Sequence, residues 1–451
     1  MKLPEKTPRI DPDIFKKLPS SKIQALFAPS EELKKLYKKA NADYLYWDRF
    51  KQLEMPEGFK AEEAWFGLTM ARHSSMREVL VDLKGDKFKF FVTSKAQSIL
   101  SKIDQFAAGN ISLGSYGDTL PLHLERNNEQ YMISSLMEEG IASSQIEGAA
   151  TTRKKAKEML KSGGKPKNKD QRMILNNYLT IRKIRDEWKD RPLSLTLIHE
   201  VHKSMSYKTM DDPSEEGRFR RDGDDVKVID EEGKILYTPP VASRIEPMVE
   251  RLCQFANTDH EDEDFIHPVV KATIIHFWLA YIHPYVDGNG RTARALFYWY
   301  MLSRKYWLFE FLSISRIILN ARKQYEAAFL YAEYDGYDLN YFISHQLRAI
   351  HQSIEDLQIY LAKKQKEFQQ SAQLLKKNQN INQRQRSLLL HAMNNPDYSY
   401  TVKAHKNVSG TSYETARHDL MELSKLGLME MHKQGKEFFF TAVPGLEDKL
   451  K

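Results

Sequence analysis

The chain has 451 residues, of which 41% are hydrophobic and 11% aromatic, so it can bury a large core spread over roughly two to four structural units. No run of about eighteen apolar residues occurs, and the beginning, MKLPEKTPRIDPDIF, has charge and proline where a signal peptide is apolar. We therefore expect a cytoplasmic protein without membrane contact. A net charge of +7 is too small at this length to indicate nucleic-acid binding, and the single cysteine excludes an internal disulfide or a cysteine metal cage.

Apolar residues recur at helical spacing along most of the chain, which predicts a mainly α fold. The first 115 residues mix helical patterns with a strand-like run at residues 87–93, and we assign them no chemistry. An amphipathic helix starts at residue 124, with Gly148 where a helix would stop. Further helices are predicted at residues 170–189, 195–205, 245–256, 267–282, 291–303, 317–334 and 339–377. The predicted domains are residues 1–115, 116–347, a helical linker at 348–380, and 381–451.

The segment at residues 217–240 changes from a helical to a strand pattern. Turn residues at 230–233 separate two short apolar runs and predict a β-hairpin. Its strands contain Val226, Val228 and Ile229 on one side, and Ile235, Leu236 and Tyr237 on the other. Since an isolated hairpin is only marginally stable, we expect it to clamp a ligand or to lie against the helices.

The last seventy or so residues have a different order of elements. Helices are predicted at residues 383–394, 401–407 and 412–426, followed by a strand pair within residues 428–443. Three helices followed by a hairpin is the order of a winged helix-turn-helix.

The segment IHPYVDGNGRTAR carries the residues best suited to phosphate chemistry. An apolar helix stops at Pro284, and Gly288 and Gly290 permit a tight turn whose backbone N–H groups form an anion-binding nest. A new helix begins near Asn289, so its positive end points at the same space. A phosphate group would fit there.

Charged side chains around this turn support the same interpretation. Arg291 and Arg294 lie in the first turn of the new helix, where each cation opposes the helix dipole by up to about 1 kcal/mol and needs an anion to offset it. Asp287 is placed to hold Mg²⁺ against phosphates, and His283 is a base suited to an incoming hydroxyl. Two alternatives are an ordinary turn between helices and a hydrolytic metal triad of His276, His283 and Asp287. The triad explains neither arginine.

Residues His283 to Arg294 resemble the signature of the Fic (Fic/Doc) family, His-Pro-Phe-x-Asp/Glu-Gly-Asn-Gly-Arg-x-x-Arg, with Tyr285 in the Phe place as the only departure. The resemblance extends over residues 124–347, about half of the chain. It implies a Fic-type helical core and a protein adenylyltransferase, because family members typically transfer AMP from ATP to a Ser, Thr or Tyr hydroxyl. The family's kinase branch has a lysine in place of the last glycine, so Gly290 argues against that branch. Phosphocholine transfer stays open.

The resemblance also assigns roles and cofactors, namely ATP and Mg²⁺. His283 would be the general base and Asp287 the ligand of a magnesium ion that bridges the α and β phosphates. The nucleotide-binding residues that it implies are Gly288, Asn289, Gly290, Arg291, Arg294, Asn320 and Tyr325, the last two on the adenine side. The hairpin resembles the family's flap, which would align an extended target segment by strand addition through Val226, Lys227, Val228, Ile235, Leu236 and Tyr237. A plain surface hairpin is the alternative.

A second element, ASSQIEGA, resembles the family's inhibitory motif Ser/Thr-x-x-x-Glu-Gly/Asn, here Ser143, Glu147 and Gly148. Its position before the core places the chain in the subgroup with an N-terminal inhibitory helix. Glu147 would pair with Arg294 and occupy the place of the γ phosphate, so that ATP binds unproductively. Without the resemblance, a solvated glutamate at a helix end would be the expected interpretation.

The tail supports a non-enzymatic alternative, a DNA-binding transcriptional regulator whose Fic-like part senses nucleotide. The candidate DNA contacts are Ser412, Tyr413, Thr415, Arg417 and His418 on the recognition helix, and Lys433 and Lys436 on the wing. The expected partners are a protein substrate, which could be this chain itself, and DNA. A homodimer is compatible with the sequence, which does not reveal the oligomeric state.

Overall fold

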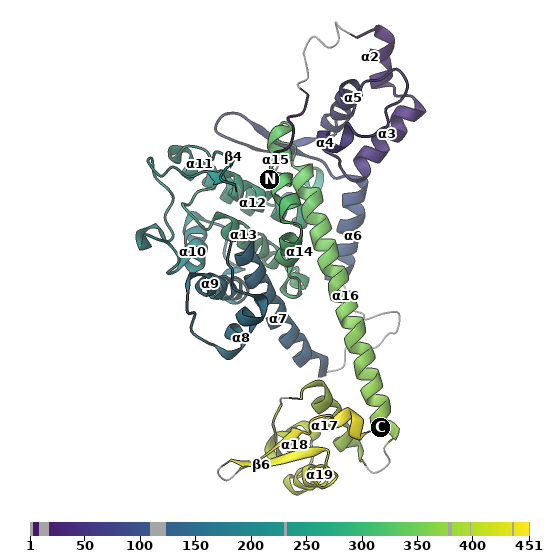
Figure 1. Ribbon diagram of the computed structural model, residues 1–451, viewed down its shortest axis with the longest axis vertical. Helices are drawn as coiled ribbons and strands as arrows, with labels where there is room; N and C mark the ends of the chain where they lie inside the picture. The colour runs from purple at the N-terminus through teal and green to yellow at the C-terminus, as the bar shows by residue number, and fades with distance from the viewer. Residues whose placement is uncertain are drawn as a thin grey trace. The chain divides into compact units, whose positions relative to one another are not determined.

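A computed structural model describes residues 3–8, 18–108, 123–229, 232–377, 381–396, 398–434 and 437–450. Contacts divide the chain into two units, which are described separately: unit 1 is Met1–Ile111 with Asn128–Glu355, and unit 2 is Ser112–Asn127 with Asp356–Lys451. Both are mainly helical, in agreement with the predicted fold class (Figure 1). Within the described residues, no helix is both long and apolar enough to cross a bilayer.

The N-terminal part of unit 1 is a small helical layer with its own apolar core and one hairpin. Its elements are α2 (Ser20–Phe27), α3 (Glu31–Ala42), α4 (Trp47–Phe50), α5 (Ala61–His73), β1 (Arg77–Val81), β2 (Lys87–Phe90) and α6 (Ser94–Ala108). The strand predicted at residues 87–93 ends at Phe90, and its partner β1 was not predicted. Tyr44 donates a hydrogen bond of 2.5 Å to Asp338, and Arg72 donates one of 3.1 Å to Tyr341. This layer therefore packs against the later helices of unit 1.

The central part of unit 1 is a bundle around two buried helices, α12 (Pro268–Ile282) and α13 (Asn289–Ser303). Because the sequence of α12 is apolar all round, this helix is covered on every side. The other elements of this part are α8 (Arg153–Ser162), α9 (Lys169–Lys183), α10 (Leu195–Ser206), α11 (Ile245–Asn257), α14 (Ile314–Asn320) and α15 (Arg322–Tyr334). It also contains α7 (His123–Ile146) from Asn128 onward and α16 (Asn340–Lys377) as far as Glu355. The helix predicted at residues 317–334 is two helices, because Ala321 leaves the helical conformation at φ −127°.

A two-stranded antiparallel hairpin, β3 (Val228–Ile229) with β4 (Ile235–Tyr237), lies at the predicted position between α10 and α11. Its first strand is shorter than predicted. The Val226 N–H bonds to the Asp224 carbonyl in a turn, and the Lys227 ammonium pairs with Asp225, so these two residues precede the ladder.

Unit 2 contains α17 (Gln383–Asn394), β5 (Tyr400–Thr401), α18 (Val402–Ser409), α19 (Tyr413–Lys425), β6 (Met429–Gln434), β7 (Glu437–Ala442) and α20 (Leu446–Lys449). The strands form one antiparallel sheet in the order β5-β7-β6. Apolar residues from the helices and the sheet share one core. The helices and the final strand pair lie close to the predicted ranges, whereas β5 and α20 were not predicted.

Candidate functional site

His283 stands at the point where α12 ends. It adopts the left-handed conformation, with φ +50°, and its N–H caps the helix by bonding to the Leu279 carbonyl at 3.0 Å. Its Nδ1 lies 3.3 Å from the Ala280 carbonyl, so the proton sits on Nδ1 and Nε2 keeps its lone pair. Burial lowers the pKa of His283 to about 4. The imidazole is therefore neutral near pH 7 and can accept a proton.

The glycine turn after His283 is fixed by the side chain of Asn289. The Tyr285 N–H donates to Asn289 Oδ1 at 2.8 Å, and Asn289 Nδ2 donates to the Tyr285 carbonyl at 2.8 Å. The Asn289 amide thus holds the loop from within, and only its backbone is free for a ligand. Gly288 has φ +85° and caps α13, a conformation that favours glycine.

The N-terminus of α13 supplies a set of unpaired backbone donors. The first helical hydrogen bond runs from the Thr292 N–H to the Gly288 carbonyl at 3.0 Å. The N–H groups of Asn289, Gly290 and Arg291 therefore precede the ladder and point out of the positive end of the helix. This is the anion-binding geometry that the sequence predicts.

Asp287 presents a half-exposed carboxylate at this end of the loop. Its Oδ1 accepts a hydrogen bond of 2.6 Å from the Gly288 N–H, and its Oδ2 lies 3.4 Å from Arg291 Nη2. No cluster of three or more metal-ligating side chains exists in the part of the chain that the structure describes. A hard cation held here by Asp287 would thus need further oxygen ligands from phosphate or water.

Arg291 and Arg294 are both buried in the first turns of α13, and within the described ranges each has a side-chain nitrogen without a hydrogen-bond partner. Arg291 Nη1 bonds to the Met205 carbonyl at 3.1 Å, and Arg294 Nε bonds to Ser143 Oγ at 2.8 Å. Arg291 Nε and Arg294 Nη1 are buried without a hydrogen-bond partner among the described residues. Unpaired buried donors are costly, so each of these two atoms favours a hydrogen-bond acceptor supplied by a ligand.

Ser143 and Glu147 bring the end of α7 against Arg294. Arg294 Nη2 donates to the Ser143 carbonyl and to Glu147 Oε1, each at 2.9 Å. Burial alone would lower the pKa of Arg294, but the Glu147 carboxylate raises it above its ordinary value. Gly148, with φ +93°, follows Glu147 and turns the chain away after the helix.

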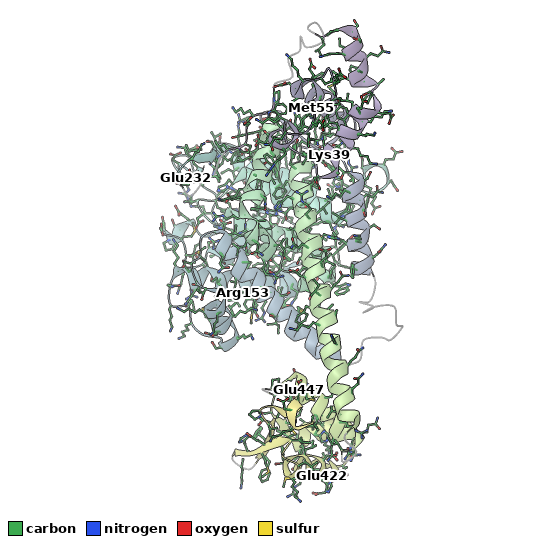
Figure 2. The ribbon with its side chains drawn as sticks, turned by 45° about the vertical axis from the view of Figure 1, so that its right-hand side comes forward. Lys39, Met55, Arg153, Glu232, Glu422 and Glu447 are labelled. Carbon is green, nitrogen blue, oxygen red and sulfur yellow. The ribbon has the colours of Figure 1, made fainter. Side chains whose placement is uncertain are left out.

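The end of α7 is itself firmly anchored. Arg153, at the start of α8 (Figure 2), donates to both carboxylate oxygens of Glu138 on α7, at 2.6 to 2.8 Å. Glu139, fully buried, accepts the Ser315 N–H at 2.9 Å and so caps α14. This cap was not predicted, because no pattern in the run LMEEG distinguishes Glu139 from Glu138.

The two residues expected on the adenine side differ in position. Tyr325 is buried and shares a 2.8 Å hydrogen bond with His276 Nε2, close to Arg294. Asn320 is exposed at the end of α14, and no contact in the described part of the chain joins it to the loop. Since His276 is buried and engaged by Tyr325, the alternative metal triad of His276, His283 and Asp287 has no structural support.

His202 on α10 holds the loop in place and was not predicted from the sequence. The Gly217 N–H donates to His202 Nδ1 at 3.0 Å, so Nε2 carries the proton and donates to the Asp287 carbonyl at 2.8 Å. The ring stacks on Tyr285 at 3.5 Å, and the Tyr285 hydroxyl lies 3.3 Å from His199 Nδ1. The only signal was the segment IHEVH at residues 198–202, which lacks zinc-protease spacing.

Arg220 was also missed. Its Nε donates to the His283 carbonyl at 2.9 Å, and its backbone N–H donates to the Pro284 carbonyl at 2.9 Å. Its Nη2 bonds to the carbonyl of Pro240, just after the hairpin. Arg220 therefore joins the hairpin segment to the loop that follows α12. In the sequence GRFRRDG, nothing distinguishes it from its neighbours Arg218 and Arg221.

Comparison with known proteins agrees with this geometry. Residues 192–301, which include the loop and both central helices, match the family described as Fic/DOC family. This part of the chain is a Fic domain. The matched residues include His283, Asp287, the glycine turn, Arg291 and Arg294, together with His202 and Arg220, which bond to backbone carbonyls of the loop.

Relatives and solved structures match the Fic domain over different lengths. Protein adenylyltransferase Fic of Drosophila virilis is 36% identical over 85 residues, 19% of this chain and 16% of that protein. The Drosophila melanogaster protein of the same name is 36% identical over 85 residues and 15% of its length. The match thus spans about a sixth of these curated relatives. A Fic family protein from Desulfovibrio desulfuricans G20 shares the fold, with a TM-score of 0.51 and 17% identity over 78% of this chain and 97% of that chain.

The hairpin of the Fic domain leaves apolar side chains exposed. Ile229 is 58% exposed and Ile235 is 48% exposed, whereas Tyr237 anchors the hairpin by donating a 2.8 Å hydrogen bond to the Tyr281 carbonyl on α12. Val226 and Lys227 lie outside the ladder, and Leu236 lies within β4. The arrangement leaves an apolar edge next to the helix that ends at His283.

Proposed function

We propose that the chain is a protein adenylyltransferase that transfers AMP from Mg-ATP to a Ser, Thr or Tyr hydroxyl of a protein. The observation that carries the proposal is the pair of unpartnered buried donors, Arg291 Nε and Arg294 Nη1, beneath the open N-terminus of α13. A triphosphate satisfies both the backbone N–H groups and the guanidinium groups. The relatives that match the Fic domain carry the name protein adenylyltransferase.

In this mechanism, His283 Nε2 accepts the proton of the target hydroxyl. The hydroxyl oxygen then attacks the α phosphorus, a new P–O bond forms, and the bond to the departing pyrophosphate breaks. The N–H groups of Gly290 and Arg291 stabilise the charge that develops on the phosphate oxygens. When bound, Mg²⁺ neutralises charge on the phosphates, and Asp287 is the residue that would hold it. Arg294 binds the terminal phosphate.

The proposal includes self-inhibition by Glu147. Its carboxylate already uses one donor of Arg294 and lies against Gly290, so the terminal phosphate and Glu147 compete for the same space. Ser143 fixes the arginine in the orientation that Glu147 uses. ATP would then bind with its terminal phosphate displaced and react slowly.

The hairpin is proposed as the docking site for the target. An extended segment could add to the β3–β4 edge and place its hydroxyl next to His283. The exposed Ile229 and Ile235 would contact the target's own side chains.

Intact-mass measurement after incubation with Mg-ATP tests the activity. The chain or an added mixture of cellular proteins should retain one adenylate per modified site, and His283→Ala should retain none. A mass gain of one phosphate would indicate phosphate transfer instead of adenylylation. A mass gain of one phosphocholine, seen only with a choline-containing donor, would indicate phosphocholine transfer.

Unit 2 supports a second, accessory function. We propose that α17 to β7 form a winged helix, with α19 as the recognition helix and β6–β7 as the wing, and that it binds DNA. The exposed Tyr413 next to the cap Ser412–Thr415 favours contact with a partner.

Charge limits how strong that binding can be. Arg417 lies 3.9 Å from Glu414 and His418 lies 3.8 Å from Glu422, so these two candidate DNA contacts have acidic neighbours. Lys433 lies over the Phe438 ring, and Lys436 lies outside the described residues. A gel shift with the full chain at low salt should therefore weaken with Arg417→Glu and disappear at higher salt. Absence of a shift at low salt would leave unit 2 as a protein-contact module.

A further inference from the structure

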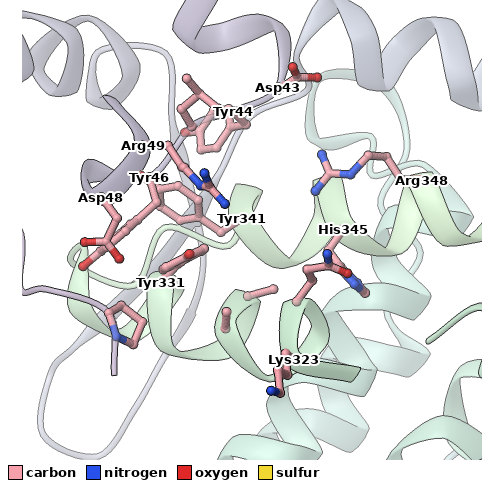
Figure 3. A pocket seen from close by; sticks show the side chains of 15 residues that line it. Asp43, Tyr44, Tyr46, Asp48, Arg49, Lys323, Tyr331, Tyr341, His345 and Arg348 are labelled. Atoms are coloured by element: carbon pink, nitrogen blue, oxygen red, sulfur yellow. The ribbon is translucent and has the colours of Figure 1, made fainter. Parts of the chain in front are cut away.

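A hollow lies in unit 1 and is lined by none of the residues of the Fic loop. It has a volume of about 360 Å³ and opens between residues 43–49 around α4 and helices α15 and α16 (Figure 3). We call it the tyrosine pocket, because Tyr44, Tyr46, Tyr331 and Tyr341 line it. Tyr46 and Tyr331 stack face to face with their ring centroids 4.1 Å apart, so that Tyr46 is buried and Tyr331 is the more exposed ring of the pair.

The tyrosine pocket is on a different face of α15 from the nucleotide site. Gln324, Ala328 and Tyr331 line the pocket at spacings of four and three residues, which places them on one side of the helix. Tyr325, about 100° further round, points instead to His276 near Arg294. The two sites therefore lie on different faces of α15 and adjoin where the Tyr325 ring meets His345 of the pocket wall, 5.9 Å between centroids.

Cationic side chains converge on the pocket from opposite walls. Arg49 on α4 and Arg348 on α16 both direct their guanidinium groups into the hollow, and Lys323 lies below them (Figure 3). In the described part of the chain, none of the three side chains donates a hydrogen bond or forms an ion pair. Like charges that face a common space repel each other, and an anion between them removes that repulsion.

The acidic residues of the pocket are already engaged. Asp43 accepts a 2.6 Å hydrogen bond from Lys95, which together with the charges of Lys95 and Arg348 lowers the pKa of Asp43. Asp48 accepts a 3.1 Å hydrogen bond from the Glu5 N–H. Neither carboxylate contacts Arg49 or Lys323, so the centre of the pocket keeps a positive charge.

His345 adds an independent indication of a ligand. It lies in the pocket wall on α16, is only 8% exposed, and its buried Nδ1 has no hydrogen-bond partner among the described residues. Burial lowers the pKa of His345 to about 4, so the ring is neutral, and in the tautomer with its proton on Nδ1 this nitrogen can donate one hydrogen bond. In that tautomer, an unpaired buried nitrogen in the same wall as Arg348 fits an oxygen of a bound anion.

We infer that the tyrosine pocket binds a small molecule that carries a phosphate group and a flat ring, of the nucleoside monophosphate type. Arg49 and Arg348 hold the phosphate from two sides, and Lys323 adds a third charge. The flat ring of the ligand packs against Tyr331, the more exposed member of the stacked pair, and extends that stack. The volume is within the range of small-molecule sites.

Arginine modification tests the inference at the pocket itself. Phenylglyoxal is added to the full chain with and without AMP, and peptide mass spectrometry measures the modification of each arginine. AMP should protect Arg49 and Arg348 at least fivefold and leave Arg182, exposed on α9, unchanged. Because Arg294 is read separately in the same spectra, binding to the Fic loop does not obscure the result.

Two comparisons sharpen the test. Adenosine, which lacks phosphate, should protect neither arginine, and ribose 5-phosphate, which lacks the flat ring, should protect more weakly than AMP. The pair Arg49→Gln and Arg348→Gln should weaken AMP binding to the pocket at least tenfold, while Arg182→Gln should leave it unchanged. Equal modification with and without AMP overturns the inference. Equal protection by ribose 5-phosphate and by AMP would show that the pocket does not recognise the flat ring. Either result leaves the adenylyltransferase proposal untouched.

Discussion

The Glu147 carboxylate lies directly against Gly290, so closely that a Cβ atom on Gly290 would overlap Glu147 Oε1. The same oxygen is 2.9 Å from Arg294 Nη2. Glu147 therefore occupies the space between the last glycine of the turn and the second arginine. This is the space in which the proposed terminal phosphate would bind.

Replacing Glu147 should release the activity. Glu147→Gly removes both the carboxylate and its contact with Arg294, and a charge-assisted hydrogen bond of about 1.5–3 kcal/mol corresponds to a rate increase of roughly tenfold or more. Glu147→Gln keeps the shape and loses the charge, so it should give an intermediate rate. The measurement is the rate at which labelled AMP is retained on protein.

The matched control is Glu158→Gln, because Glu158 is an exposed glutamate on the neighbouring helix α8. It should leave the rate unchanged. Equal labelling by Glu147→Gly and the parent chain would remove self-inhibition from the proposal.

His283 should set an unusual pH profile. Its pKa is lowered to about 4 by burial, so it gains a proton and loses its catalytic lone pair only as the pH falls towards that value. We expect kcat/KM, which reports the free enzyme, to show no limb from this histidine between about pH 5.5 and 8. A fall in kcat/KM below about pH 6.5 that persists when each of the other histidines is replaced would contradict the assignment.

His283→Ala should abolish labelling while nucleotide binding persists, because the phosphate contacts come from α13 and its arginines. Calorimetric titration with ATP measures the binding. A variant that labels protein at the parental rate would exclude His283 as the base.

From the sequence it is easier to predict which side chains gather at the loop than which residues elsewhere in the chain hold the loop in place. The glycine turn, His283, Asp287 and both arginines lie within twelve residues, so their proximity follows from the chain itself. The Glu147–Arg294 pair joins residues 147 positions apart and was predicted only through a family motif. His202 and Arg220 act through backbone carbonyls, which leave no pattern in the side chains. The same is true of Asn289, whose amide faces the loop interior.

His202→Phe should show how strongly the loop depends on this support. Phenylalanine keeps a ring on Tyr285 but loses the hydrogen bonds to the Gly217 N–H and the Asp287 carbonyl. The free energy of unfolding should fall by about 2 kcal/mol, and labelling should fall by roughly tenfold because Asp287 is less well held. Urea unfolding and labelling rates provide the measurements.

His199→Phe is the matched comparison, since phenylalanine keeps the ring packed against Phe219, at 4.2 Å between centroids, and loses the 3.3 Å contact between His199 Nδ1 and the Tyr285 hydroxyl. Its effects on both measurements should be smaller. If the two variants are equally stable and equally active, the His202 hydrogen bonds do not position the loop.

Gly290→Ala separates two functions of the same glycine. In the parent chain, the new methyl group must push Glu147 away, which relieves inhibition. The methyl carbon would also lie 3.1 Å from Arg294 Nη1, so it narrows the space for a phosphate. These effects have opposite signs, so the single variant alone is ambiguous. In the Glu147→Gly background only the second effect remains, and there Gly290→Ala should lower the labelling rate by about tenfold. Unchanged labelling in the double variant would mean that the phosphates do not approach Gly290, and the nest at the start of α13 would then have to bind a different group.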